Sequence, residues 1–581
     1  MTSAFATTSP LRAAEAALAA DTAHNDPAVW ITRLPDAAIL EAALALEAEG
    51  PRGRPLWGTS FAVKDNIDIA GLPTTAACPG FRYEPSSTAP VVQRLLDAGA
   101  LLVGKTNLDQ FATGLAGVRS PYGVPRNVFD PSRVPGGSSS GSACAVAAGI
   151  VTFALGTDTA GSGRVPAAFG NVVGLKPTIG SFSGRGIVPA CRSIETVSVF
   201  ARSVDEALAV ARAAASYDDA DPYSRAAPFA HLRRGEDPAH ARIAVADTLP
   251  ECDAPMLAAY ARAASLFDTV PSDIAAFLEI ARLLYDGPWV AERSAALRGF
   301  IAANPDALHP ATRTILEAGF SRLSIDAFDA FHRLAACRRF AARLFRSVDA
   351  LLLPTAPFCP SLDELAADPI GPNSRLGTFT NFVNLCDLAA IAVPAGFGSD
   401  GVPVGVTLIG PAWSESRLAG LSDRVHRGLV RTIGASDQPL PPRPGPDAIG
   451  PDETPLFCLG AHMSGLPLNH EIRALGGRFV RAAETTAEYR LYALGRRPGL
   501  VRVDPGDGAS IAGEVWALPT AAIGALLARV PPPLSFGTVQ LADGPCLGFL
   551  AEAFAVADAP DVSRYGGWRC WLDASTSVTV D

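Results

Sequence analysis

The stretch 134–178 constrains this chain more than any other part of it, because two glycine- and serine-rich turns enclose one block of small apolar residues. The first turn, 136–142, precedes residues 143–149, whose small side chains favour a tightly packed buried helix with serine at its N-cap. A strand-like run, 150–155, follows. The second turn, 157–163, places a serine among residues that let backbone N–H groups approach a ligand closely. This pattern indicates a nucleophile beside an oxyanion hole.

Turns of this composition are also typical of flexible linkers. Two observations disfavour a linker in this chain. The turns flank apolar sequence that suits burial, and an ordered pattern continues after them in the runs 164–166 (Arg-Val-Pro) and 176–178 (Lys-Pro-Thr). We therefore interpret the stretch as part of a folded site.

The same stretch closely resembles the signature of the amidase signature enzymes, which usually runs GGSSGGS, then GTDxGGSxRxPA, then GxKPT. The resemblance implies an α/β fold with a mixed central sheet covered by helices. It also implies a catalytic triad of a lysine, a serine that follows a cis peptide bond and a nucleophilic serine. The matching residues in this sequence are Lys64, Ser138 and Ser162.

Two positions depart from the usual family pattern. Ser140 and Ala160 stand where glycine is usual. The methyl group of Ala160 would narrow the oxyanion hole, although its backbone N–H group stays available as a donor. The resemblance places that oxyanion hole at the backbone amides of Thr159, Ala160, Gly161 and Ser162.

A serine hydroxyl becomes a good nucleophile only when a base removes its proton, and a lysine can be that base only when it is neutral. Burial in an apolar site lowers the pKa of a lysine towards the working range. Lys64 lies in a strand-like apolar run, which fits such a site, whereas a lysine taken by itself is usually exposed. In the relay that we expect, Ser162 gives its proton to Ser138, which passes one to Lys64.

Other chemistries find little support. The eight histidines lie far from the stretch 134–178 in the sequence, no HExxH or paired CxxC motif occurs, and the two glycine-rich turns lack the GK[ST] ending of a phosphate-binding loop. We expect no metal and no organic cofactor. A net charge of −10 disfavours nucleic acid or an anionic membrane as the main partner, but not a small anionic substrate. Ten scattered cysteines and a lack of any secretory signal or long apolar span favour a cytoplasmic protein.

The rest of the first 436 residues reads as alternating helices and strands, as expected of an α/β domain. Lys105 reads as structural or close to the substrate, and residues 111–122 read as a loop near the substrate region. We predict helices at 11–20, 37–47, 91–98, 204–214, 255–267, 274–284, 328–345 and 415–429, and strands at 60–63, 100–103, 241–246, 350–354, 388–394 and 402–409.

A second informative run, YDGPWVAER, covers residues 285–293. Within the amidase signature family it is similar to a pattern of the allophanate hydrolases, in which the tyrosine and the arginine bind the substrate. The matching residues are Tyr285 and Arg293. A guanidinium fork suits a carboxylate, and a phenol can donate to a carbonyl or carboxylate oxygen. Without the resemblance, an amphipathic helix with Arg293 on its exposed face would be the simpler interpretation.

A proline- and aspartate-rich segment, 437–455, predicts a linker between a catalytic domain, 1–436, and a second domain, 456–581. The second domain resembles the carboxy-terminal domain of the allophanate hydrolases in AHMSG (461–465), YRLY (489–492) and GEVW (513–516). The resemblance implies a small α+β fold like the β-barrel of γ-glutamylcyclotransferases and a role in decarboxylation. The candidate polar groups are His462, His470 and Glu514, although buried histidines are more often structural than catalytic.

The combined resemblance implies hydrolysis of allophanate, a small anion, through an acyl-enzyme on Ser162, with N-carboxycarbamate converted further to ammonia and carbon dioxide. It also implies a homodimer and coupling either to a biotin-dependent urea carboxylase or to a triazine pathway. Three alternatives stay open: an amidase for another small amide, the amidase subunit of a tRNA-dependent amidotransferase, and a noncatalytic relative that binds a urea-derived metabolite. The retained Lys64, Ser138 and Ser162 disfavour the last of these.

Overall fold

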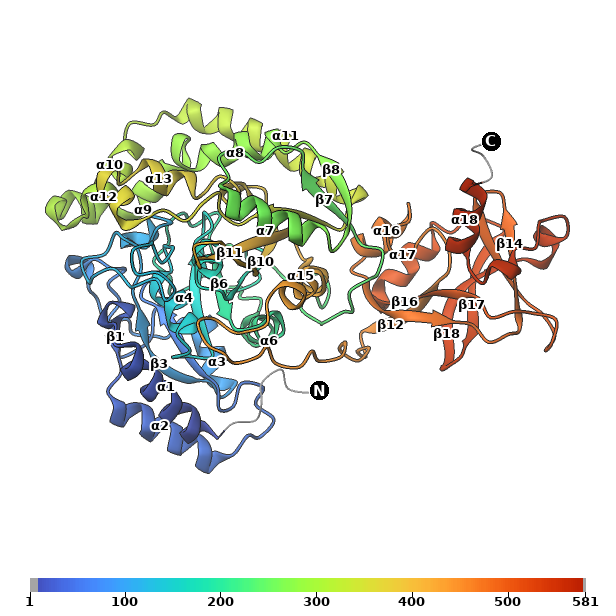
Figure 1. Cartoon of the computed structure of the whole chain (residues 1–581), viewed down its shortest axis with the longest axis horizontal. Helices are drawn as coiled ribbons and strands as arrows, with labels where there is room; N and C mark the ends of the chain where they lie inside the picture. The colour runs from blue at the N-terminus through green and yellow to red at the C-terminus, as the bar shows by residue number, and fades with distance from the viewer. Residues whose placement is uncertain (1–8, 578–581) are drawn as a thin grey trace.

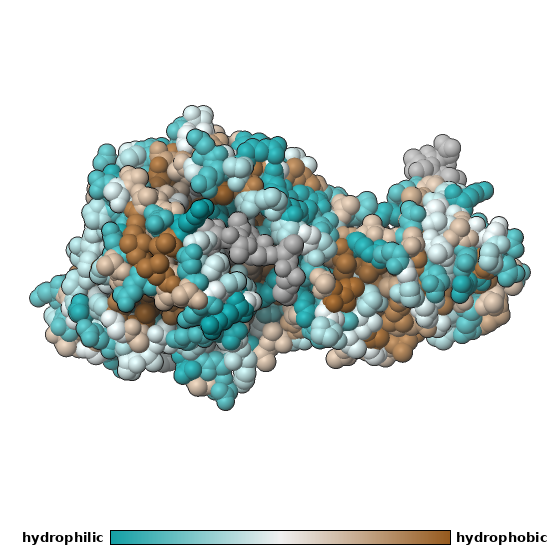
Figure 2. Space-filling model, turned by 90° about the horizontal axis from the view of Figure 1, so that it is seen from below, coloured by the Kyte–Doolittle hydropathy of each residue, from teal (hydrophilic) through white to brown (hydrophobic). Residues whose placement is uncertain are grey.

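The computed structural model describes residues 9–577, which form a large body and a smaller one joined side by side (Figure 1). The large body is built on an 11-stranded mixed sheet with the strand order β1-β3-β2-β4-β6-β5-β10-β11-β9-β7-β8. Helices cover this sheet on both sides, as the sequence predicted for an α/β domain. Figure 2 shows the narrower waist between the two bodies and apolar residues gathered in separate patches on each.

The strands of the large sheet are β1 (Trp30–Arg33), β2 (Ser60–Lys64), β3 (Leu101–Thr106), β4 (Phe153–Asp158), β5 (Val173–Lys176), β6 (Thr196–Ala201), β7 (Arg242–Ala246), β8 (Asp268–Ser272), β9 (Ala350–Pro354), β10 (Leu388–Phe397) and β11 (Pro403–Pro411). The helices of the large body are α1 (Pro10–His24), α2 (Asp36–Glu49), α3 (Pro90–Asp97), α4 (Ser140–Ala147), α5 (Val165–Phe169), α6 (Val204–Ala214), α7 (Ala254–Ala264), α8 (Ala275–Asp286), α9 (Trp289–Ala303), α10 (Pro310–Gly319), α11 (Ser324–Ser347), α12 (Leu362–Ala367), α13 (Gly371–Arg375), α14 (Asn381–Leu385) and α15 (Glu415–Leu429).

Burial explains why the central strands form where they do. Every residue of β2 and β4 is buried, as expected for parallel neighbours that are covered on both faces. The phenyl rings of Phe61 and Phe153 stack between these two strands, with centroids 5.2 Å apart. The carboxyl ends of β2 and β4 therefore lie side by side, with Lys64 at the end of one and Asp158 at the end of the other.

The predicted helix and strand around residues 143–155 were displaced by about three residues in the sequence-based interpretation. The helix α4 begins at Ser140, and its N-cap residue, Ser139, makes no capping hydrogen bond with its side chain. Ser139 Oγ instead bonds to the backbone of Thr157, with 3.2 Å to the carbonyl oxygen. The strand starts only at Phe153 because residues 148–152 form a tight turn closed by the hydrogen bond from Ile150 N to Ala145 O.

The smaller body contains a five-stranded sheet in the order β13-β16-β12-β18-β17 and a separate hairpin, β14-β15. Its edge strands β13 and β17 meet at a bridge between Thr485 and Leu541, so that the sheet closes on itself at one end. This arrangement agrees with the α+β fold that the sequence predicted. Its elements are β12 (Glu453–Cys458), α16 (Asn469–Ala474), β13 (Arg478–Glu484), β14 (Tyr489–Leu494), β15 (Arg497–Arg502), β16 (Ala512–Pro519), α17 (Ile523–Leu527), β17 (Leu534–Leu541), β18 (Gly544–Ala551) and α18 (Trp568–Ser577).

Hydrogen bonds to backbone carbonyl groups and ion pairs such as Arg473–Asp349 connect the two bodies. Arg473 on α16 donates to Val348 O at 2.8 Å, and Arg478 on β13 donates to Arg234 O at 3.2 Å. The strand β12 begins at Glu453, inside the segment that the sequence marked as a linker. No helix among residues 9–577 is long and apolar enough to cross a membrane.

Candidate active site

Lys64 and Ser138 meet at the carboxyl end of β2. The Lys64 ammonium nitrogen Nζ lies 2.8 Å from Ser138 Oγ and 2.8 Å from Thr157 Oγ1, and the lysine has no exposed surface. The peptide bond between Gly137 and Ser138 is cis, as the family resemblance implied. The structure therefore brings together two of the three residues of the predicted triad, although they are 74 positions apart in the sequence.

Burial sets the protonation of Lys64. The loss of solvent around the side chain lowers its pKa to about 7, against an ordinary value of 10.5, while the negative charges of Glu195, Asp109 and Asp158 partly offset this effect. A lysine with a pKa close to neutrality exists in substantial part as the free amine, which can accept a proton from a hydroxyl. Lys64 therefore meets the requirement that a lysine acting as a base be partly neutral near pH 7.

Ser162 lies in the turn after β4, and a buried ion pair holds this turn in shape. Arg164 donates through Nε and Nη2 to the two carboxylate oxygens of Asp158, both at 2.9 Å. The amides of Gly161 and Gly163 donate to the same carboxylate. Burial alone would raise the pKa of Asp158, but the guanidinium and these hydrogen bonds hold it below its ordinary value.

The predicted oxyanion hole is only partly free to act as one. The N–H group of Gly161 is already used, because it donates to Asp158 Oδ1 at 3.0 Å. The amides of Thr159, Ala160 and Ser162 make no hydrogen bond among the residues that the structure describes. In the same part of the chain, no hydrogen bond links Ser162 Oγ to Ser138. The relay is thus hydrogen-bonded from Lys64 to Ser138 and open between Ser138 and Ser162.

The loop that follows β3 connects the pair Lys64 and Ser138 to the predicted substrate-binding residue Arg293. Asp109 accepts from the amides of Gly117 and Arg119, and Gly137 N donates to Leu115 O, so the loop is fixed against the Gly137–Ser138 peptide. Thr113 from the same loop accepts a hydrogen bond of 3.1 Å from Arg293 Nη1. The predicted substrate region at 111–122 therefore contacts one of the predicted substrate-binding residues.

Tyr285 and Arg293 lie against each other in the interior. Arg293 on α9 is 2% exposed, so the alternative that placed it on an exposed helix face is wrong. Its guanidinium carbon is 5.3 Å from the centre of the Tyr285 ring. The Tyr285 hydroxyl is buried and has no hydrogen-bond partner among the described residues. A buried donor without a partner and a buried cation without a carboxylate partner suit an anionic, hydrogen-bonding ligand.

Several contributors to the site carry no signal in the sequence. Glu195 is buried, and burial raises its pKa. The positive charges of Lys64 and Arg293 both lower this pKa, so the carboxyl group of Glu195 lies close enough to interact with both cations. Thr157 bonds to both Lys64 and Asn66. Asn384 reaches the nucleophile turn from α14 and donates to Asp158 O at 2.7 Å. Lys105, by contrast, is structural, because it pairs with buried Asp65 at 3.0 Å.

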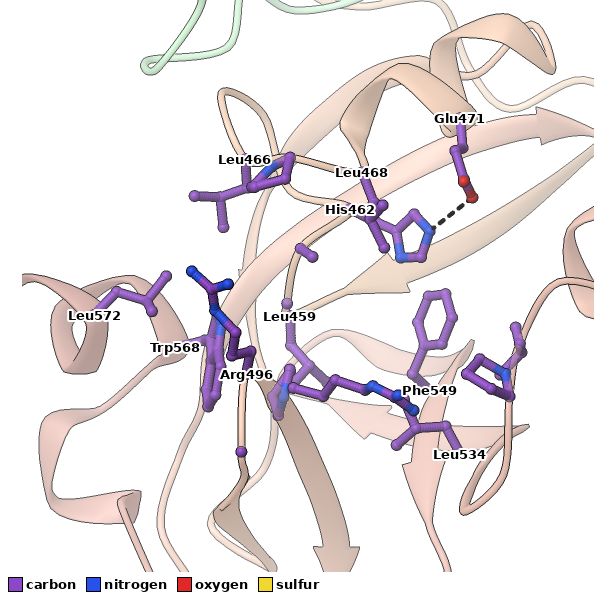
Figure 3. A pocket seen from close by; sticks show the side chains of 18 of the residues that line it. Leu459, His462, Leu466, Leu468, Glu471, Arg496, Leu534, Phe549, Trp568 and Leu572 are labelled. Carbon is purple, nitrogen blue, oxygen red and sulfur yellow. Dashed lines mark ion pairs between the residues drawn. The ribbon is translucent and has the colours of Figure 1, made fainter. Parts of the chain in front are cut away.

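The three candidates in the second body do not form one cluster. His462 lines a cavity of about 760 Å³, stacks on Phe549 and faces Glu471 at 3.6 Å (Figure 3). His470 lines a different cavity, at the junction of the two bodies. Glu514 is fully engaged by its neighbours, since it accepts hydrogen bonds from the backbone amide and the hydroxyl of Ser464 and from Trp516 Nε1.

Comparison with known proteins gives consistent results for both bodies. The amidase family model matches residues 12–419, and the allophanate hydrolase C-terminal domain model matches residues 454–573. The urea amidolyase of Saccharomyces cerevisiae is 40% identical over 571 residues, which are 94% of this chain but 31% of the yeast protein. This chain thus spans about a third of the length of that relative.

Two further relatives cover different shares of this chain. The structure of Kluyveromyces lactis allophanate hydrolase superposes with a TM-score of 0.77 at 38% identity, covering 98% of this chain and 97% of the yeast chain. A glutamyl-tRNA(Gln) amidotransferase subunit of Symbiobacterium thermophilum is 37% identical over 437 residues, which are 68% of this chain and 89% of that protein. The latter similarity therefore leaves about a third of this chain unmatched.

Proposed function

Because this chain belongs to the amidase family, in the group that carries the allophanate hydrolase C-terminal domain, we propose that it hydrolyses allophanate. One observation carries the proposal. The loop 109–119 links a buried lysine–serine pair, Lys64 and Ser138, to a buried tyrosine–arginine pair, Tyr285 and Arg293. The first pair suits the activation of a nucleophile, and the second suits the recognition of a carboxylate.

In the reaction that we propose, Ser162 Oγ attacks the terminal amide carbon of allophanate. The serine proton passes by way of Ser138 to the neutral Lys64, and the relay then returns a proton to the leaving ammonia. The free amides of the turn, Thr159, Ala160 and Ser162, stabilise the negative charge on the oxygen, each contributing on the order of 10²–10³ in turnover. Water then cleaves the acyl-enzyme and releases N-carboxycarbamate.

Arg293 is proposed to hold the substrate carboxylate, and Tyr285 to donate its free hydroxyl to a substrate oxygen. Arg293 already donates to Thr113 through Nη1, which fixes the plane of the guanidinium and leaves its other donors for a ligand. Since a guanidinium prefers planar carboxylates, the pair selects allophanate over neutral amides of the same size.

We propose that the second body acts on the product of the first. The cavity around His462, shown in Figure 3 with Arg496 labelled, is also lined by Arg497 and Arg529, and three arginines suit a product that carries two carboxylates. Burial lowers the pKa of His462, while Glu471 partly restores it, so that the imidazole is mainly neutral and can accept a proton near pH 7. Glu514 is proposed to position Ser464 rather than to act on the product.

Two proposals concern partners. Carboxylation of urea yields allophanate, and the matched relatives are urea amidolyases, so we propose that a biotin-dependent urea carboxylase supplies the substrate. We also propose a homodimer that uses the start of α11. Apolar side chains there are more than half exposed, a pattern typical of protein interfaces. They are Leu323, Ile325, Phe328 and Phe331.

The test is a comparison of ammonia release from allophanate, malonamate, biuret and a simple aliphatic amide, for the wild type and for Arg293→Ala. Activity on allophanate that the substitution removes would support both the substrate and the carboxylate clamp. Activity on neutral amides alone would replace the proposal with a general amidase. The amidotransferase alternative is less favoured, because the matched amidotransferase protein covers only 68% of this chain.

A further inference from the structure

A second cavity lies at the junction of the two bodies, next to the cavity of His462, with which it shares the lining residues Leu466 and Pro467, and it is strongly cationic. Its volume is about 450 Å³. We call it the junction cavity and define it by the residues that line it: Arg242, Arg343, Arg346, Ser347, Asp349, Gly465, Leu466, Pro467, Asn469, His470 and Arg473. Four guanidinium groups thus share a cavity with a single carboxylate, in a chain whose net charge is −10.

The one carboxylate does not balance these charges. Asp349 is buried, pairs with Arg473 at 3.0 Å and also accepts a hydrogen bond from the backbone amide of Arg242 at 2.9 Å. Among the residues that the structure describes, the side chains of Arg242, Arg343 and Arg346 make no ion pair and no hydrogen bond. The donors of these three guanidinium groups, two of which are exposed, are therefore available to a ligand in the cavity.

Two guanidinium groups strengthen this conclusion, one from the lining of the cavity and one from a neighbouring cavity. Arg473 is only 8% exposed, yet its Nε has no hydrogen-bond partner in the described structure. Arg417 on α15 lines a neighbouring cavity together with Arg473 and Asp349, and among the described residues its side chain has no ion pair and its Nε has no hydrogen-bond partner. Burial, together with the charge of Arg473, lowers the pKa of Arg417 to about 9. Arg473 is paired with Asp349 and Val348 O but keeps an unused buried donor, and an unpaired donor of a buried charged group is costly unless an anion accepts from it.

The elements around the cavity come from both bodies. Arg242 begins β7, and Arg343 and Arg346 lie in the last turns of α11, all in the large body. His470 and Arg473 lie on α16 of the smaller body, beside the waist of the molecule (Figure 1). An anion bound between them would neutralise charges that otherwise repel each other across the junction.

We propose that the junction cavity binds a small anion that carries two or more negative charges on oxygen atoms, and that this anion fixes the smaller body against the large one. Guanidinium groups bind both phosphate and carboxylate oxygens in pairs of hydrogen bonds, so inorganic phosphate and small dicarboxylates share the required chemistry. The site is separate from Lys64, Ser162 and Arg293, and the proposal does not depend on the reaction that they catalyse.

Titration calorimetry of the full chain tests the proposal, with sodium phosphate and sodium malonate as the two probes and sodium chloride used to keep the ionic strength constant. Three variants are compared with the wild type. Arg346→Gln removes a charge from the exposed wall of the cavity, where the fold tolerates the change. Arg339→Gln removes an exposed charge from the same helix outside the cavity. Arg293→Gln disables the carboxylate clamp of the proposed active site.

We expect saturable binding of at least one probe to the wild type, to Arg339→Gln and to Arg293→Gln, and about tenfold weaker binding to Arg346→Gln, as for the loss of one charge-assisted hydrogen bond. Binding of phosphate alone identifies an inorganic or phosphorylated ligand, and binding of malonate alone identifies a dicarboxylate. Both outcomes support the site. The absence of saturable binding, or binding that Arg346→Gln leaves unchanged, would overturn it.

Hydrogen exchange gives a second, independent readout. The bound anion should slow amide exchange in α16 and at the start of β7 in the wild type, because these segments line the cavity from opposite bodies. The same addition to Arg346→Gln should leave exchange in both segments nearly unchanged. Equal protection in the two proteins would mean that the anion acts elsewhere, and would also overturn the proposal.

Discussion

Lys64 Nζ lies 2.8 Å from Ser138 Oγ, in a place where the lysine has no contact with solvent. The nitrogen has a second acceptor, Thr157 Oγ1, at the same distance. When the amine is neutral, a hydrogen bond donated to Thr157 leaves the nitrogen lone pair free to accept the proton of Ser138, so Thr157 orients the base.

The first prediction concerns pH. Because the pKa of Lys64 is about 7, the amine is protonated below that value and cannot accept a proton, whereas above it the base is available. We therefore expect kcat/KM for allophanate to rise about tenfold per pH unit on the acid side and to level off above about pH 7. Rates measured in overlapping buffers between about pH 5.5 and 9 check this. A profile that is flat across that range would contradict the assigned base.

The second concerns the carboxylate clamp. Arg293→Gln keeps a planar hydrogen-bonding group but removes the charge, and the loss of one charge-assisted contact should raise KM for allophanate by roughly 10- to 100-fold. Rates on a neutral amide should change little. Arg298→Gln on the same helix, at an exposed position, serves as the matched control and should behave as the wild type. Equal effects on charged and neutral substrates would rule out a role in carboxylate recognition.

The third concerns the nucleophile turn. Gly161 has a φ of +130°, and a Cβ atom there would lie 2.4 Å from Thr380 Oγ1. Gly161→Ala should therefore displace the turn that carries Ser162, lower stability by about 1–3 kcal/mol and reduce kcat by more than about 100-fold. Gly299→Ala, in a helix with open space around it, should keep full activity. Thermal unfolding and steady-state rates of both variants decide the matter.

The fourth concerns a departure from the usual family sequence. The hydroxyl of Ser140 is buried without a hydrogen-bond partner in the described structure, so Ser140→Ala should leave stability unchanged or raise it by up to about 1 kcal/mol. The neighbouring Ser139 bonds to the backbone of Thr157 through its hydroxyl, so Ser139→Ala should lower stability by about 1 kcal/mol. Chemical denaturation of the two variants checks this contrast, and the reverse order would contradict it.

The sequence predicted those parts of the molecule whose signal is local. Helices at 204–214 and 415–429 and the strand at 350–354 have the predicted bounds, because each has a clear apolar pattern between polar flanks. The strand β8, Asp268–Ser272, was missed, since none of its residues is fully buried and it lies at the edge of the sheet. The linker was predicted three residues too long, because β12 begins with two polar residues, Glu453 and Thr454.

The supporting residues of the site could not be predicted, because their contacts join distant parts of the chain. Thr157 bonds to Lys64 across 93 positions, and Asn384 bonds to the backbone of Asp158 across 226. No spacing rule connects such residues. Closeness in the sequence can also mislead, as His462 and His470 show, because these two histidines line different cavities. The short helix α16 starts between them and turns His470 towards the junction of the two bodies.

The most direct test of the account is the rate of ammonia release from allophanate by the wild type and by Ser162→Ala, measured with both proteins shown to be folded by the same thermal transition. We expect steady turnover by the wild type and loss of turnover in the variant, because no acyl-enzyme can form without Oγ. Turnover of allophanate by Ser162→Ala at the wild-type rate, or none by the folded wild type, would contradict it.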